Sequence, residues 1–406
     1  MIERPLYSEI WAELAGEKSM VFMAGPRQAG KTTLARRWAA ERPNRVYFNW
    51  DEPGARARLV RAPTFFTQVE RRDASPPLVV FDELHKYSRW KAYLKGTYDR
   101  YHEEYRFLVT GSGRLDLYRR GGDSLAGRYL LFHLWPFTMA ELGRSAEATE
   151  EGFWQNPARP APEVMEHSRI WNRLLTASGF PDPYLTGKES SWRRWSAGYG
   201  MRVIREDIRD LTAVRTVQDM AVLYELLPER VGSPLSLNAL AEDLRVSYHT
   251  VQSWMDIFDR FYLTFRLQPW TQAVARSLQK ERKAYLFDVP LVSEPAARLE
   301  NAVALDLFAW IHRMNDRGWG PYGLFYVRDR EKREVDFLVT RQRKPALLVE
   351  VKLSDPVPSA ALRKFQAQWR IPAVQLLGVG DGYRMLAGAA APILVAPAWK
   401  WLPGLP

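Results

Sequence analysis

The sequence contains no cysteine among its 406 residues. Disulfide bonds, zinc–thiolate sites and a cysteine nucleophile are therefore excluded. Long apolar runs are also lacking, because the longest one near the end, AGAAAPILVAPAW, is too short to span a bilayer and is interrupted by prolines. The first residues, MIERPLYSEI, have no apolar core of the kind that a signal peptide requires. We expect a cytoplasmic protein with no membrane contact.

Negative charge is in shorter supply than positive charge. The 58 Lys and Arg residues outnumber 47 Asp and Glu residues, which leaves a net charge of +11 at pH 7. Such an excess favours an anionic partner, of which nucleic acid is the commonest, although a need for solubility would produce it too. The length and a hydrophobic content of 46% predict two to four packed domains.

Up to about residue 135, short apolar runs alternate with helical patterns, which predicts an α/β fold with a parallel sheet covered by helices. The first run leads into GPRQAGKTT, which fits the pattern G-x-x-x-x-G-K-[ST] and opens a helical stretch. This strand–loop–helix context is what a phosphate-binding loop requires, and it disfavours a chance match on a glycine-rich turn. The predicted nucleotide-binding residues are Gly25, Pro26, Arg27, Gln28, Ala29, Gly30, Lys31, Thr32 and Thr33.

The chemistry of this loop predicts ATP and Mg²⁺ as cofactors. Glycines let backbone N–H groups close around phosphate oxygens, and the helix N-terminus adds its dipole. Lys31 is expected to reach the β- and γ-phosphates, and the Thr32 hydroxyl to hold Mg²⁺.

Catalytic candidates follow on later strands. PLVVFDELHK ends in Asp82, which can hold the Mg²⁺ shell, and Glu83, which can act as general base toward a water. RFLVTGSGR carries Thr110 and Ser112 near its end, and these hydroxyls could sense the γ-phosphate. An ordinary polar turn would show the same residues. Arg128 follows a glycine and is a candidate arginine finger acting in trans, or an ordinary surface arginine.

Together GPRQAGKTT, YFNWDEP, VVFDELHK, LVTGSGR, SLAGRYLLFHLWPFTMAEL and GFPDPYL resemble a prokaryotic family of AAA+ (P-loop) ATPases. These carry a C-terminal domain of unknown function with a restriction-endonuclease-like fold. The resemblance covers nearly the whole chain. It implies Walker B and sensor strands on the same side of the P-loop strand, a helical lid, and a homo-oligomer such as a hexameric ring.

The segment LSLNALAEDLRVSYHTVQSWMDIFDRFYLTFRL predicts two helices capped by Ser236 and Ser247. The second helix would present His249 and Gln252 outward, as a DNA recognition helix does. Two strands would follow as a wing whose tip holds phosphates. The predicted tip residues are Arg276, Lys280, Arg282 and Lys283. A winged-helix fold used only for packing or protein contacts remains the alternative.

The stretch VDFLVTRQRKPALLVEVK places Glu350 and Lys352 two residues apart on one strand face, with Asp336 beside them on the preceding strand. Two close carboxylates repel unless a cation lies between them, so Asp336 and Glu350 are predicted to bind Mg²⁺, with Lys352 orienting water or neutralising a phosphate. Glu300 on an upstream helix would complete the set. The four residues resemble the D…ExK signature of the restriction-endonuclease-like fold. An ordinary hairpin, in which acid and lysine simply pair, is the alternative.

These observations predict four domains: a P-loop AAA+ ATPase core at 1–142, a helical lid at 143–230, a winged-helix domain at 231–292 and an α/β restriction-endonuclease-like domain at 293–406. The predicted function is a Mg²⁺-dependent AAA+ ATPase, an ATP hydrolase, acting on DNA as a motor, remodeller or nuclease-linked machine. Nuclease activity stays open, because such folds also persist as inactive DNA-binding modules. The alternative is a regulatory nucleotide switch that acts on protein partners and carries an inert C-terminal domain.

Overall fold

The computed structural model describes residues 2–111, 125–145, 148–162, 164–208, 217–271, 281–389 and 391–406. They divide into two compact units, one of residues 1–135 with 260–262 and the other of residues 136–259 with 263–406. Each unit has its own sheet and its own hydrophobic core. No helix in the described ranges is both long enough and apolar enough to cross a membrane.

The first unit contains a five-stranded sheet in the order β2-β3-β4-β1-β5, with every pairing parallel. Its strands are β1 (Met20–Ala24), β2 (Arg45–Asn49), β3 (Leu78–Asp82), β4 (Arg106–Thr110) and β5 (Leu130–His133). All residues of β1 and β3 are buried, because helices cover both faces of the sheet. The predicted α/β fold with a parallel sheet is confirmed.

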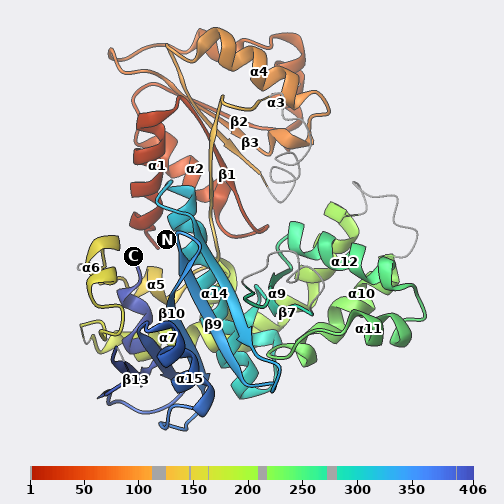
Figure 1. Cartoon of the computed structure of the whole chain (residues 1–406). Coiled ribbons are helices and arrows are strands. Elements are labelled where there is room, and N and C mark those ends of the chain that lie inside the picture. Colours follow the sequence, from red (N-terminus) through yellow and green to blue (C-terminus); the bar gives the residue numbers. More distant parts are fainter. Residues whose placement is uncertain are drawn as a thin grey trace. The chain divides into compact units, whose positions relative to one another are not determined.

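Helices lie on both faces of this sheet (Figure 1). Two of them, α1 (Pro5–Glu17) and α2 (Lys31–Ala40), pack on one face with Val21 and Met23 of β1. The other two, α3 (Pro53–Arg61) and α4 (Trp90–Tyr101), pack on the opposite face, where Phe22 of β1 points. Alternate residues of one strand thus enter opposite cores, as the pleat requires.

The second unit begins with helices and ends with a mixed sheet. Its helices, in the described ranges, are α5 (Met139–Leu142), α6 (Glu150–Gln155), α7 (Glu166–Ala177), α8 (Pro181–Thr186), α9 (Glu189–Arg202), α10 (Val217–Leu226), α11 (Leu237–Asp243), α12 (Tyr248–Arg260), α14 (Pro295–Asp316) and α15 (Ala360–Trp369). An antiparallel pair, β6 (Thr264–Leu267) and β7 (Lys283–Leu286), lies between α12 and α14.

The mixed sheet has the order β12-β13-β11-β10-β9-β8. Its strands are β8 (Tyr322–Arg328), β9 (Glu334–Arg341), β10 (Lys344–Lys352), β11 (Ala373–Leu377), β12 (Arg384–Leu386) and β13 (Ile393–Pro397). β8, β9 and β10 form an antiparallel meander, and α15 then leads to β11, which pairs parallel to β10.

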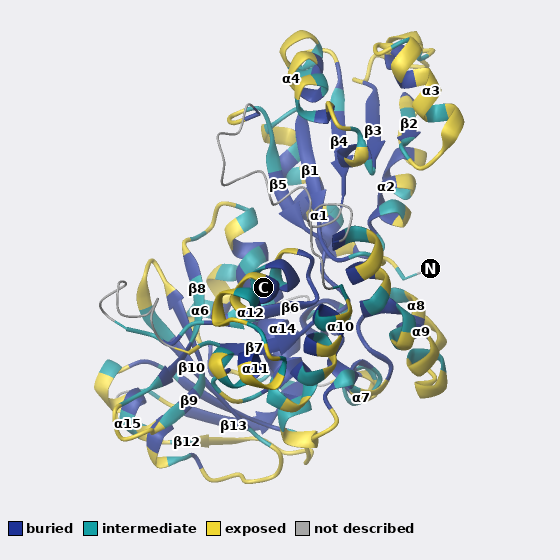
Figure 2. Cartoon of the chain, turned by 90° about the vertical axis from the view of Figure 1, so that its right-hand side faces the viewer, coloured by how far each residue is buried: buried dark blue, intermediate teal, exposed yellow. Residues whose placement is uncertain are grey.

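Helix α14 is the central helix of the second unit, and most of its residues are buried (Figure 2). It packs against β7, β8 and β10. The Asn301 side chain binds both the N–H and the C=O of Leu286, each at 2.8 Å, so α14 is tied directly to β7. This brings residues of α14, β7, β9 and β10 into one neighbourhood.

Candidate functional site

The phosphate-binding loop runs between β1 and α2, and two glycines allow its path. Gly25 has φ 144°, and a Cβ added there would lie 2.2 Å from the carbonyl oxygen of Leu134. Gly30 has φ 98° and precedes α2 directly. Other residues rarely adopt these backbone angles, and at Gly25 no side chain fits. The loop is therefore a narrow turn that ends at a helix N-terminus.

Lys31 is the first residue of α2 and is only 5% exposed. Its ammonium donates to the carbonyl oxygens of Gly25, at 2.9 Å, and Pro26, at 2.6 Å, so it lies over the loop. Arg4 holds the loop from another side, donating to the carbonyl oxygens of Ala29, at 3.1 Å, and Trp135, at 2.7 Å. No motif in the sequence marked Arg4.

Asp82 ends β3 and is completely buried. One carboxylate oxygen accepts the Tyr47 hydroxyl at 2.5 Å, and the other accepts the Thr110 hydroxyl. Burial, with the bond to Asp82, raises the pKa of Tyr47 well above its ordinary value, so this hydroxyl stays a donor. Arg36 of α2 hydrogen-bonds the same tyrosine and lies 5.0 Å from its ring centre. These donors fix the orientation of the carboxylate that would hold Mg²⁺.

Thr110 therefore points at Asp82, whereas the sequence suggested a role in sensing the γ-phosphate. Its partner in that prediction, Ser112, lies outside the described residues. Tyr47 was missed by the sequence analysis, although a signal exists. It pairs in register with Val80, two residues before Asp82, so Tyr47 and Asp82 share one face of adjacent strands.

Glu83 follows Asp82 in a left-handed conformation with φ 57°, which is uncommon for a residue with a side chain. Its carboxylate lies 3.1 Å from the Lys86 ammonium and 3.7 Å from Nε2 of His85. Lys86 also binds both carboxylate oxygens of Asp51, at 2.8 and 2.7 Å. Burial lowers the pKa of Lys86, but Glu83 and Asp51 outweigh burial and raise it. Glu83 is thus held beside the Mg²⁺-binding candidate in an ion pair.

Arg128 pairs within its own chain. Its Nε lies 2.6 Å from Oδ1 of Asp99 on α4, and an Nη lies 3.2 Å from Oδ2. The pairing raises the pKa of Arg128 and lowers that of Asp99. A role as an arginine finger in trans stays a prediction, and it would require this pair to open.

The helices α11 and α12 begin at the predicted caps. Ser236 accepts the N–H of Ala239 at 3.3 Å, and Ser247 accepts that of Thr250 at 3.1 Å. His249 and Gln252 are exposed on α12, so DNA contact by these residues stays a prediction. Of the predicted wing tip, Arg276 and Lys280 lie outside the described residues, and Arg282 is half-buried.

The prediction that Lys283 contacts DNA is wrong. Lys283 is the first residue of β7 and is 0% exposed. Its ammonium lies 3.0 Å from Glu300, 2.7 Å from Glu334 and 3.6 Å from Asp336. A fully buried ammonium cannot reach a phosphate backbone. The basic run KERK suggested a solvated tip, but pairing in β7 turns this side chain inward.

The predicted C-terminal residues do come together, in an acidic cluster formed by Glu300, Glu334, Asp336 and Glu350. Val349 of β10 pairs with Phe337 of β9, so the next pair, Glu350 and Asp336, lies on one face. Lys352 contacts Glu350 at 3.3 Å. Burial, then the charge of Asp336, raises the pKa of Glu300 to about 7. Burial also raises the pKa of Glu350, which is 2% exposed.

This cluster does not fit the predicted Mg²⁺ site at Asp336 and Glu350. Among the described residues, no three His, Asp or Glu side chains converge as metal ligands. Asp336 is occupied by the backbone N–H of Val351, at 2.8 Å from Oδ2, and by Lys283. Glu350 accepts the N–H of Ser359, at 3.4 Å, besides its ion pair with Lys352.

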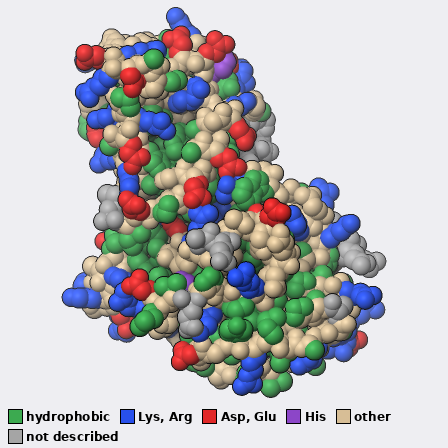
Figure 3. All heavy atoms as spheres, turned by 90° about the vertical axis from the view of Figure 1, so that its left-hand side faces the viewer, with side chains coloured by type: hydrophobic (Ala, Val, Ile, Leu, Met, Phe, Trp, Pro, Cys, Tyr) green, Lys and Arg blue, Asp and Glu red, His purple; other side chains and the backbone are tan. Residues whose placement is uncertain are grey.

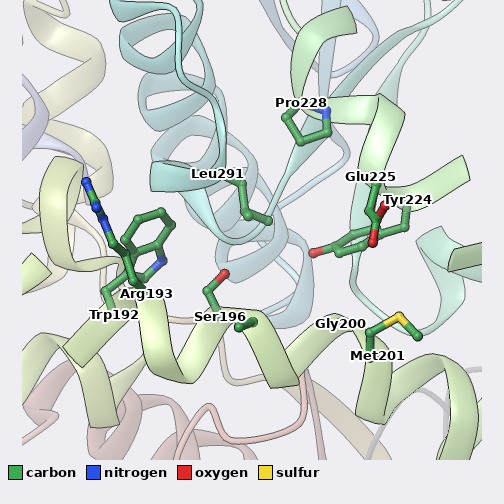
Figure 4. Close-up of a pocket in the computed structure, with 10 residues that line it drawn as sticks. Trp192, Arg193, Ser196, Gly200, Met201, Tyr224, Glu225, Pro228 and Leu291 are labelled. Carbon is green, nitrogen blue, oxygen red and sulfur yellow. The ribbon is translucent and has the colours of Figure 1, made fainter. Parts of the chain in front are cut away.

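A cavity of about 320 Å³ lies between α9 and α10 (Figure 4). Trp192, Gly200 and Tyr224 are among the residues that line it, and Arg193 and Glu225 flank it from opposite sides. Ser196, also in its lining, donates to the buried carboxylate of Asp288 at 2.6 Å. The Ser196 hydroxyl is thus held by Asp288, and the cavity offers space for a ligand.

Comparisons with known proteins agree with the first site. The AAA domain family matches residues 17–143. Two domains of unknown function, DUF8612 and DUF4143, match residues 168–300 and 297–385. The family match, the phosphate loop and the parallel sheet together identify an AAA-type P-loop ATPase fold in the first part of the chain.

Similar whole proteins share little identity with this chain. An uncharacterized protein of Mycobacterium tuberculosis is 23% identical over 370 residues, which cover 89% of this chain and 77% of that protein. One of Methanocaldococcus jannaschii is 22% identical over 405 residues, covering 90% and 81%. A solved Walker-type ATPase of Pyrococcus abyssi is 16% identical, with a TM-score of 0.46, over 75% of this chain and 96% of that chain. The Aeropyrum pernix ORC1 protein in complex with DNA is 14% identical, with a TM-score of 0.33, over 76% and 94%.

Proposed function

We propose that this protein is a Mg²⁺-dependent ATP hydrolase that acts on DNA. The observation that carries the hydrolase is the junction of Asp82 and Glu83 at the end of β3: a carboxylate oriented by two hydroxyl donors, followed by a second carboxylate that is 20% exposed. One buried group is suited to fix a metal, and the next to take a proton from water.

The roles of the chain's own residues follow from their places. The backbone N–H groups of residue 25 and residues 27–33, with the N-terminus of α2, would bind the phosphates, and Lys31 would exchange its carbonyl partners for phosphate oxygens. Thr32 and Asp82 would hold Mg²⁺, which would supply positive charge to neutralise the phosphates. Glu83 accepts the proton of the attacking water. Its ion pair with Lys86 must loosen for this step, because a paired carboxylate is a weaker base.

ATP hydrolysis with matched variants tests this assignment. Lys31→Ala should weaken nucleotide binding, whereas Glu83→Gln should keep binding and lose turnover by roughly 10²–10⁴-fold, as loss of a general base does. Glu41→Gln is the control, since Glu41 is an exposed acid paired only with a surface arginine in the described contacts. Hydrolysis by Glu83→Gln at the parental rate would contradict the role of Glu83.

DNA as the partner rests on the net charge of +11 and on the exposed polar face of α12. Basic and acidic side chains are interspersed on the face that Figure 3 shows, so that face offers no broad basic surface. The element order α14–β8–β9–β10–α15–β11 is compatible with a restriction-endonuclease-like module that binds DNA. Affinity for duplex DNA should fall steeply with salt, and His249→Ala with Gln252→Ala should weaken it.

A regulatory nucleotide switch is the second candidate. The ion pair between Glu83 and Lys86 favours it, because a restrained base slows turnover. A tight nucleotide complex that hydrolyses negligibly, with no salt-sensitive affinity for DNA, would support the switch and contradict the DNA-acting hydrolase.

A further inference from the structure

The ammonium of Lys283 is fully enclosed at the centre of the acidic cluster. It contacts three carboxylates, those of Glu300, Glu334 and Asp336, at 3.0, 2.7 and 3.6 Å. The Tyr326 ring centre lies 5.7 Å from it. Burial lowers the pKa of this lysine, but the three negative charges outweigh burial and raise it above the ordinary value. The side chain is therefore a permanent cation at physiological pH.

The contacts suit an ammonium, which has three N–H donors and no acceptor. Glu300 and Glu334 lie within hydrogen-bond distance of it, and Asp336 lies 3.6 Å away as an ion-pair partner. Mg²⁺ makes a different demand, with near-octahedral oxygen ligands at about 2.0–2.1 Å and several retained waters. A lysine that reaches the cluster from β7 takes the central position and is 0% exposed.

Other contacts hold the same carboxylates in place. The Tyr285 hydroxyl donates to Glu300 at 2.8 Å. An Arg328 nitrogen lies 3.5 Å from Glu334. On the far side of Glu300, a Cβ added at Gly232 would come within 3.2 Å of Oε2, so little space adjoins that oxygen. The carboxylates are thus arranged around a cation that the chain itself supplies.

The charges of the neighbourhood nearly balance. The four carboxylates of the acidic cluster face three cations, Lys283, Lys352 and Arg328. The difference is one negative charge. A divalent ion would gain little attraction here and would lie close to the Lys283 ammonium.

We propose that Lys283 is a built-in cation that replaces a divalent metal in this acidic cluster, and that the C-terminal module therefore performs no metal-dependent phosphodiester cleavage. The proposal is independent of ATP hydrolysis in the first unit. One side chain, that of Lys283, distinguishes this cluster from a metal-loaded nuclease centre. Lys283 is not one of the four residues of the D…ExK pattern.

Binding of Mn²⁺, followed by the electron paramagnetic resonance signal of the free ion, tests the proposal. The full chain is used without nucleotide and with Asp82→Asn, so that the ATP site adds no metal. This protein should show no Mn²⁺ binding that depends on Asp336. Lys283→Met, which keeps the length of the side chain without its charge, should bind Mn²⁺ at least about ten-fold more tightly, because the carboxylates then lack a cation. Lys344→Met, an exposed lysine of β10, is the matched control and should change nothing.

Two results would overturn the proposal. One is stoichiometric Mn²⁺ binding by the parental chain that Asp336→Asn abolishes. The other is a Lys283→Met protein with parental circular dichroism and no gain in Mn²⁺ affinity. If Lys283→Met does not fold, two measurements replace it. The first compares Mn²⁺ binding by the parental chain and by Asp336→Asn. The second measures Mn²⁺ binding by the double variant Lys283→Met with Glu334→Gln, which removes one charge of each sign.

Discussion

Replacing Tyr47 by Phe should impair Mg²⁺-dependent ATP hydrolysis while leaving the first unit folded. The substitution removes one hydroxyl, which donates to the buried Asp82 carboxylate at 2.5 Å. The ring stays, and with it the packing against the Arg36 guanidinium, 5.0 Å from the ring centre. Asp82 loses one of its two hydroxyl donors, although the Thr110 hydroxyl still binds the other oxygen, and Arg36 loses its hydrogen bond to the tyrosine hydroxyl.

The size of the effect follows from this bond. A hydrogen bond to a charged group contributes about 1.5–3 kcal/mol, and about 1.4 kcal/mol corresponds to a factor of ten. Loss of a group that orients a metal ligand typically lowers metal affinity or activity by about 10–100-fold. Both lines of reasoning predict that Mg²⁺-dependent activity falls by one to two orders of magnitude. The fall should appear chiefly as a higher Mg²⁺ concentration needed for hydrolysis.

The assay is the rate of ATP hydrolysis as a function of Mg²⁺ concentration. Tyr93→Phe is the control, since the Tyr93 hydroxyl donates to the Pro63 carbonyl at 2.8 Å in the same unit and away from Asp82. The reasoning would be refuted by a Tyr47→Phe protein whose Mg²⁺ requirement stays within about two-fold of the parent while Asp82→Asn abolishes turnover.

Three further outcomes are expected. Lys86→Ala frees the Glu83 carboxylate from its 3.1 Å ion pair and should raise basal ATP turnover severalfold; an unchanged or lower rate would assign Lys86 a positioning role. Asp306 accepts the N–H groups of Met139 and Ala140, and burial raises its pKa to about 7. A raised carboxyl pKa means that the folded state binds the proton more tightly, so stability is lost as pH rises from about 4 to about 7. Melting temperatures should therefore fall less from pH 5 to pH 8 in Asp306→Asn than in the parent, and equal falls would contradict this. Inactive Arg128→Ala and Glu83→Gln proteins should restore activity when mixed if Arg128 acts on a neighbouring subunit, and no recovery would exclude that role.

The nucleotide site was predictable because its functional residues lie in two short, continuous stretches of sequence. One stretch of nine residues carries the glycines, Lys31 and Thr32, and one strand end carries Asp82 and Glu83. The placement of Glu350 beside Asp336 was predictable for a related reason, since strand pleat and hairpin pairing are local rules.

The residues that escaped prediction act over long sequence distances. Arg4 reaches Trp135, and Tyr47 reaches Asp82, through contacts that only the assembled sheet creates. Lys283 lies in a basic run that is typical of a solvated loop, and only packing of β7 against α14 and β9 makes it the cation of the acidic cluster. Its burial places an ammonium beside carboxylates, among them Asp336, that were predicted to bind Mg²⁺.

The place of β1 in its sheet has a consequence for synthesis on the ribosome. β1 pairs with β4 and β5, with Met20 opposite Phe107 and Val21 opposite Leu130, so both partners are made long after it. At about 5–20 residues per second, the roughly 110 residues from β1 to β5 take on the order of 5–20 s to translate. During that interval the wholly apolar strand β1 lacks its partner strands, so it can aggregate or bind a chaperone. The nascent chain thus acquires its nucleotide site only after residue 133 has left the exit tunnel.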